Sequence, residues 1–152
     1  MSGQSLKVDS LEFDKLEVED RELIVDAVSP ITAYSTFERR AGSKITHYFT
    51  PQDKAFEYLI EENFIRKFEA FYNQPFEDEG QVLTIEPIQV NKWDKIVTNY
   101  KGTWITGWKG KYRLKAKPEY LTFLLNTGMG PKNSLGCGMV LPESTLPIRN
   151  FN

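Results

Sequence analysis

A glycine-rich segment near the end of the chain holds the residues whose types and spacing are best suited to chemistry. Gly128, Gly130, Gly136 and Gly138 form a G-x-G-x5-G-x-G array around Lys132-Asn133-Ser134. Glycine tolerates positive φ and lets another backbone approach closely, and successive backbone N–H groups in such loops bind anions. With a lysine and two small polar side chains added, the array predicts a phosphate-binding loop.

This array differs from the two common nucleotide-binding loops. It lacks the Gly-Lys-Ser/Thr ending of a P-loop, and its spacing is not the dinucleotide G-x-G-x-x-G. The order of elements is also inverted, because an apolar helical run over 118–126 precedes the glycines and a short strand over 137–141 follows them. The alternative interpretation is that the glycines only let the chain cross tightly over its own sheet.

A basic segment precedes the glycine array. Residues 92–117 hold eight Lys or Arg against one acid, a net charge of +7 in a chain whose total is −2. Strand alternation over 104–115 separates two faces. One face is aromatic and apolar, with Trp104, Thr106, Trp108, Tyr112 and Leu114, and the other is basic, with Lys109, Lys111, Arg113 and Lys115. We expect the aromatic face to pack beneath the helices and the basic face to meet a polyanion, the alternative being a solvated surface.

Other reactive groups are few. His47 is the only histidine; it is a candidate general base, although a strand histidine between Thr and Tyr is more often structural. Cys137 is the only cysteine, which excludes an intrachain disulfide, and it is expected to pack beside the glycines. Asn63 and Lys67, one helical turn apart, either form a polar patch near the glycine loop or merely cap the helix face. No ligand cluster is visible, so we expect no metal and no cofactor.

Hydrophobic periodicity and turn signals define the predicted elements. Thr50 is the expected N-cap of the first helix, and Gly128 is expected to end the second. The predicted strands are one or two within 5–18, then 22–35, 45–49, 82–90, a bent strand or hairpin over 92–116, and 137–141, with helices over 51–72 and 118–126.

This order predicts an α+β protein with a ferredoxin-like (RRM/RAMP) βαββαβ fold. We expect an antiparallel sheet with two helices on one face and an extra N-terminal strand. The predicted division is an N-terminal strand and connecting segment over 1–22, one ferredoxin-like domain over 23–145 and a tail over 146–152. With no signal peptide and no membrane-spanning apolar run, the chain is expected in the cytoplasm.

The glycine array, with Met129 inside its first G-x-G and Lys-Asn-Ser-Leu-Gly after it, resembles the C-terminal glycine-rich loop of the RAMP superfamily. The resemblance is greatest to the CRISPR-associated endoribonucleases that process precursor crRNA. Three further stretches match in order, Ser29-Pro30-Ile31, 63–68 and 107–112. The resemblance covers residues 23–142 and implies a ferredoxin-like RAMP domain.

The resemblance also implies an activity. In this family a base activates a ribose 2′-OH, which cleaves the adjacent phosphodiester without a metal ion. The characteristic histidine lies in an N-terminal fold, whereas this chain has room for one fold and matches the C-terminal one. His47 matches no catalytic motif of the family, so the catalytic residues are unknown and it is uncertain whether this chain is itself an enzyme.

The expected share of this chain is therefore RNA binding. The predicted RNA-binding residues are Gly128, Gly130, Lys132, Asn133, Ser134, Gly136, Gly138, Lys109, Lys111 and Arg113. The expected partners are CRISPR repeat RNA, other CRISPR-associated proteins or an N-terminal half, and a homodimer is a further hypothesis, with no membrane involved. One alternative is a non-catalytic crRNA-binding RAMP subunit or half of a split enzyme. A second is a ferredoxin-like domain for small molecules or protein interaction.

Overall fold

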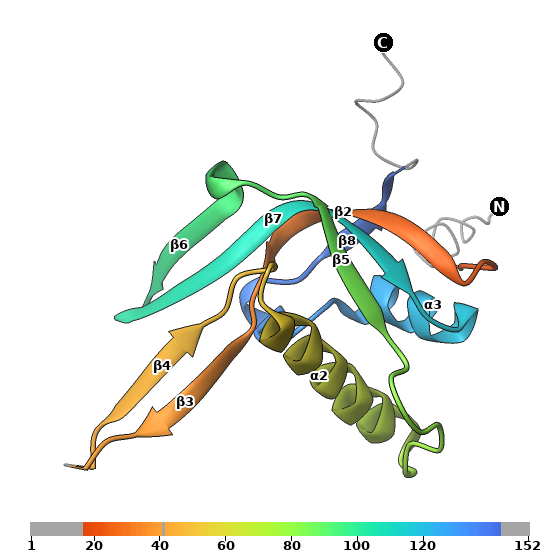
Figure 1. Cartoon of the computed structure of the whole chain (residues 1–152). Coiled ribbons are helices and arrows are strands. Elements are labelled where there is room, and N and C mark those ends of the chain that lie inside the picture. Colours follow the sequence, from red (N-terminus) through yellow and green to blue (C-terminus); the bar gives the residue numbers. More distant parts are fainter. Residues whose placement is uncertain (1–16, 41, 144–152) are drawn as a thin grey trace, which may run out of the picture.

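The computed structural model describes residues 17–40 and 42–143. In this part of the chain an arched antiparallel sheet lies over two helices, and two hairpins project beyond the helices at one end (Figure 1). The elements are β2 (Glu22–Ile31), β3 (Tyr34–Glu38), β4 (Lys44–Tyr48), α2 (Lys54–Tyr72), β5 (Thr84–Gln89), β6 (Lys95–Tyr100), β7 (Thr103–Lys115), α3 (Pro118–Thr127) and β8 (Val140–Pro142). Short 3₁₀ turns span Lys92–Asp94 and Asn133–Leu135.

The sheet has the order β5-β7-β2-β8, with every neighbouring pair antiparallel. The strand β7 is long enough to pair with β5 and β2 at one end and with β6 at the other. The strands β3 and β4 form a separate hairpin. The prediction of an α+β protein with an antiparallel sheet and two helices is confirmed.

The core lies between the sheet and the helices. Phe64 of α2 is fully buried, and its ring centroid lies 5.2–5.9 Å from those of four other aromatic rings, Phe68, Phe76, Tyr120 and Phe123. Phe56 and Ile60 of α2 are buried as well, whereas Phe71 near the helix end is 68% exposed. This packing fixes the position of α2 relative to α3 and to the loop that follows α3.

The start of α2 differs from the prediction, whereas its end at Tyr72 agrees with it. Asp53, not Thr50, is the N-cap. The Asp53 carboxylate accepts hydrogen bonds from the backbone N–H and the hydroxyl of Thr50, at 3.0 and 3.2 Å. These bonds close a turn over 50–53, so the helix begins three residues later than Pro51.

The predicted aromatic face of β7 is also wrong. Tyr112 and Leu114 are buried, but Trp104 is 63% exposed and Ile105 is buried in its place. Gly110 has φ of +110°, and the pairing of β7 with both neighbours shifts register at this level. The additional residues lie in the partner strands: residues 28–30 of β2 lie opposite residue 109 alone, and Ile88 of β5 has no counterpart in β7. The regular alternation of faces along β7 is therefore broken at this level.

Two predicted segments fall outside the residues that the structure describes. These are nearly all of the strand region predicted over 5–18 and the whole tail over 146–152. Between residues 17 and 143, leaving out 41, the structure has no helix whose length and apolar character would let it cross a membrane.

Candidate nucleic-acid interface

The inner glycines of the array form a tight crossing of the chain over β2. Gly138 donates its backbone N–H to the carbonyl of Pro30 at 2.7 Å, and Met129 donates to the carbonyl of Gly138 at 2.8 Å. A Cβ built on Gly138 would lie 2.1 Å from the Met129 carbonyl oxygen, and one on Gly130 would lie 2.8 Å from the Thr32 carbonyl oxygen. These contacts leave no room for a side chain, so the packing interpretation holds for this part of the array.

Lys67 of α2 stabilises the same crossing through hydrogen bonds from its ammonium group. Lys67 Nζ donates to the carbonyls of Gly128 and Gly130, at 2.8 and 3.3 Å, and to Asn133 Oδ1 at 2.8 Å. Three acceptors match the three donors of an ammonium group, while burial lowers the pKa of Lys67 to about 8. Of the two roles considered for Lys67 in the sequence, contact with the glycine loop is the one observed.

Asn133 belongs to this internal network and does not face outward. Besides accepting from Lys67, its side chain donates Nδ2–H to the Cys137 carbonyl at 2.9 Å. Asn133, which the sequence predicts as an RNA contact, therefore takes part in the packing of the loop itself. Because both ends of the amide are engaged, RNA would have to displace one of these bonds to use it.

The outer part of the array is a single turn that we call the loop tip, residues 132–136. Ser134 and Gly136 are exposed, and the turn is closed by hydrogen bonds from Leu135 N–H and Cys137 N–H to the Lys132 carbonyl. Lys132 Nζ lies 4.9 Å from the ring centroid of Tyr34 on β3. The tip thus offers an ammonium group and a hydroxyl to solvent on a turn anchored at both ends.

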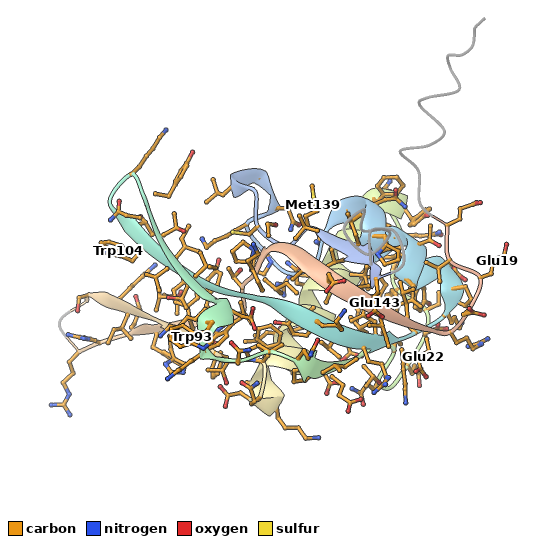
Figure 2. The ribbon with its side chains drawn as sticks, turned by 90° about the horizontal axis from the view of Figure 1, so that it is seen from above. Glu19, Glu22, Trp93, Trp104, Met139 and Glu143 are labelled. Atoms are coloured by element: carbon orange, nitrogen blue, oxygen red, sulfur yellow. The ribbon has the colours of Figure 1, made fainter. Side chains whose placement is uncertain are left out.

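Two of the four residues of the predicted basic face of β7, Lys111 and Arg113, are paired with carboxylates. Lys111 Nζ lies 3.3 Å from Asp26 and 2.7 Å from Glu143, and hydrogen bonding to Glu143 raises the pKa of Lys111. Figure 2 looks onto this open side of the sheet and labels Glu143 beside the strands.

Arg113, two residues further along β7, is paired in the same way. Its guanidinium lies 3.1 Å from both Glu22 and Glu86, which belong to the strands on either side. Two cations here face four carboxylates, so this surface of the sheet does not carry an excess of positive charge.

Other lysines have aromatic neighbours in place of carboxylates. Lys92 Nζ lies 5.0 Å from the ring centroid of Trp93, and Lys101 Nζ lies 5.5 Å from that of Tyr100. Within the described ranges, neither of these lysines, nor Lys95, Lys109 or Lys132, forms a salt bridge. We call Lys92, Lys95, Lys101 and Lys132 the unpaired lysines.

Two exposed tryptophans lie at opposite ends of the β6–β7 hairpin. Trp93 and Trp104 are 79% and 63% exposed, and Figure 2 shows Trp104 near the far end of the β6–β7 hairpin. The sequence signal for this region was the whole basic segment, of which only the β7 portion was selected as RNA-binding.

His47 lies away from these groups on the exposed β4 strand. It sits opposite Ser35 in the β3–β4 hairpin, and its ring meets Phe49 edge-on at 4.5 Å. That contact is a packing contact, and the role of His47 as a base stays a prediction. Among residues 17–40 and 42–143, no group of three His, Cys, Asp or Glu side chains is arranged to hold a metal ion.

Comparison with known proteins agrees with the sequence resemblance. Residues 13–141 match the family described as CRISPR associated protein Cas6, C-terminal, and the chain belongs to this family. It is 30% identical over 120 residues to CRISPR-associated endoribonuclease Cas6 1 of Methanocaldococcus jannaschii, a match that covers 78% of this chain and 44% of that protein.

Solved structures share the fold. The product of a Cas6-related gene from Pyrococcus furiosus superposes with a TM-score of 0.73 at 21% identity, covering 86% of this chain and 51% of that one. A RAMP protein described as binding different RNA substrates gives 0.71 at 20% identity, with 84% and 51% covered. The chain therefore spans about half the length of the relatives it matches.

Proposed function

We propose that this chain binds CRISPR repeat RNA as the C-terminal part of a crRNA-processing endoribonuclease. Cleavage, by attack of a 2′-OH without a metal ion or cofactor, is assigned to residues in the portion of the relatives that this chain does not span. We further propose that the domain is ferredoxin-like and acts in the cytoplasm. The strand order β5-β7-β2-β8, with α2 and α3 each leading from one strand to the next, supports the ferredoxin-like assignment.

The observation that carries the proposal is the loop tip, exposed and anchored beside lysines that have no carboxylate partner. Phosphate contacts need cations that are free to replace counterions. Lys132, Ser134 and Gly136 of the tip, and Lys109 on β7, remain proposed RNA contacts. Lys111 and Arg113 are weaker candidates, because RNA would have to compete with their carboxylates. The inner glycines Gly128, Gly130 and Gly138, together with Asn133 of the loop tip, act by shaping the loop.

Known relatives support the choice of ligand. One structure similar to this chain is a RAMP protein described as binding different RNA substrates, and another is described as a Cas6 product complex. The shared fold makes an RNA ligand the first choice here too. We also propose that the catalytic partner is an N-terminal half or another CRISPR-associated protein. A homodimer of this chain is a separate hypothesis about its oligomeric state, which light scattering would test.

A second candidate function is a non-catalytic crRNA-binding subunit that holds RNA without cleaving it. Half of a split enzyme, the other alternative, belongs with the first candidate because its partner would supply cleavage. The non-catalytic subunit is favoured by the position of the single histidine, which is exposed on a hairpin and packed against Phe49. The two candidates share the RNA-binding surface and differ only in whether a partner restores cleavage.

The test is to mix the purified chain with the repeat RNA of its own genome in EDTA. Fluorescence anisotropy over a salt series reports binding, and a denaturing gel reports cleavage, with His47→Ala run in parallel. We expect salt-sensitive binding and no cleavage by the chain alone. Specific cleavage that His47→Ala abolishes would assign catalysis to this chain, and no binding at low salt would reject the proposal.

A further inference from the structure

A small apolar pocket lies between the inner face of the β6–β7 hairpin and the loop tip, with a volume of about 120 Å³. Its walls come from both elements and include Ile96, Thr98, Tyr100 and Ile105 of the hairpin and Leu135 and Cys137 of the glycine segment. The pocket is separate from the inner crossing, although the same loop contributes to both.

The sequence of the hairpin explains why this hollow exists. The β6–β7 register pairs Ile96 with Gly107 and Thr98 with Ile105, which places these four residues on one face. A Cβ on Gly107 would lie 2.6 Å from the Pro30 side chain. The absence of a side chain at Gly107 thus lets the end of β2 approach the hairpin and form one wall of the pocket.

We propose that this pocket takes one unpaired nucleobase of the RNA whose phosphates contact the loop tip, an inference that rests on the proposed function. A nucleobase is a flat ring with apolar faces and a polar edge, and proteins hold unpaired bases by stacking them on aromatic rings beside cations. Tyr100 supplies a ring at the pocket wall and Thr98 a hydroxyl. Duplex RNA buries its bases in the stack, so the base must be unpaired.

Charge around the pocket favours RNA over a protein segment as the occupant. Lys101 lies over the Tyr100 ring at the hairpin turn, and Lys132 lies in the loop tip on the other side of the pocket. Neither lysine has a carboxylate partner in the described part of the chain. A base in the pocket would place its flanking phosphates beside these two cations.

The experiment is an abasic scan of the repeat RNA, in which each oligonucleotide lacks one base but keeps every phosphate. Affinity is measured for the wild type, for Thr98→Phe, which fills the pocket, and for Val97→Phe. Val97 is the neighbouring residue on the opposite face of β6 and is 51% exposed, so it is a matched control. Circular dichroism confirms that all three proteins are folded.

At one position, or at two adjacent ones, we expect removal of the base to weaken binding by the wild type about tenfold, the size of one lost stacking contact. Removal of the same base should weaken the RNA affinity of Val97→Phe about tenfold and leave the affinity of Thr98→Phe almost unchanged. A scan in which no position depends on Thr98 overturns the inference while leaving RNA binding intact. Absence of binding by intact RNA overturns the proposed function as well.

Cys137 gives a second readout in the unaltered protein. It is the only cysteine, it lines the pocket, and burial raises the pKa of its thiol. We expect saturating intact RNA to slow alkylation of Cys137 by N-ethylmaleimide at pH 8.5, and the sensitive abasic RNA, also at saturation, to protect it far less. Equal protection by the two RNAs would mean that no base enters the pocket.

Discussion

The glycine array contains two regions whose glycines have different roles. The inner glycines lie against other backbone, where a Cβ on Gly138 would meet the Met129 carbonyl oxygen at 2.1 Å, whereas a Cβ on Gly136 at the tip would meet nothing within 4 Å. Both glycines have positive φ, +84° and +90°. The inner region is therefore required by the fold, and the tip is available for a ligand.

The lysines and arginines divide in the same way. Lys67 is turned inward onto the loop carbonyls, and Lys111 and Arg113 are held by carboxylates from neighbouring strands. The unpaired lysines have aromatic rings or solvent beside them in place of carboxylates. The comparison shows that positive charge in the sequence indicates an RNA site only after its internal partners are known.

The largest expected effect comes from the inner glycine Gly138. Gly138→Ala should lower the free energy of unfolding by more than about 4 kcal/mol, because backbone must move to relieve the collision. Gly136→Ala, which has the same positive φ and open space, should cost only about 1–2 kcal/mol. Urea denaturation of the two variants measures the difference, and equal losses would mean that the inner and outer glycines are not distinct.

Lys67 should come next. Lys67→Met keeps an apolar stem but leaves three acceptors without their donor, so we expect a loss of about 2–3 kcal/mol in the free energy of unfolding. RNA affinity should fall as well, because the loop tip loses its anchor. Arg66→Met is the control, since Arg66 is exposed and forms only an i,i+4 pair with Glu62 at 3.7 Å, worth under about 0.5 kcal/mol. Similar stability of the two variants would contradict the anchoring role.

At the loop tip a substitution should lower RNA affinity and leave the free energy of unfolding unchanged. Lys132→Gln should weaken repeat-RNA binding about fivefold, on the order of one exposed charge contact of about 1 kcal/mol. Its unfolding curve should match that of the wild type within about 0.5 kcal/mol. Anisotropy and urea denaturation of the same preparation test both parts, and an equal loss of stability would place Lys132 with the inner region.

The smallest expected effect is a pH dependence. The pKa of Lys67 is about 8 in the folded chain against 10.5 for an ordinary lysine. Between these values the unfolded chain binds more protons, so the free energy of unfolding should rise with pH, while below about pH 8 the cost of burying the charge is fully present. Wild type should therefore gain stability relative to Lys67→Met between pH 7.5 and 9.5. If thermal melts showed that wild type loses stability relative to Lys67→Met over this interval, the lowered pKa of Lys67 would be contradicted.

Much of the fold was accessible from the sequence because its signals are local. Apolar spacing located α2 and α3, and Gly128 correctly marked the end of the second helix. The bulge at Gly110 was not predictable, since it depends on the close approach of Gln89 and Val90, where a Cβ would meet atoms at 2.8 Å.

The site was only partly predictable for the same reason. The array itself was visible, but Lys67 and Asn133 meet across 66 residues. The carboxylates that pair with Arg113 come from two distant strands, 91 and 27 residues away. Sequence shows which charges exist, whereas tertiary structure decides which of them remain available to a ligand.

The most direct test of the account compares the salt dependence of repeat-RNA binding in two double variants. Each phosphate contact on single-stranded RNA adds about 0.7 to the slope of log affinity against log salt. Lys101→Gln with Lys132→Gln should therefore reduce the slope by about 1.4, while Lys111→Gln with Arg113→Gln should leave it unchanged. The reverse result, a slope reduced only in the second variant, would place the RNA on the open face of the sheet and contradict the account.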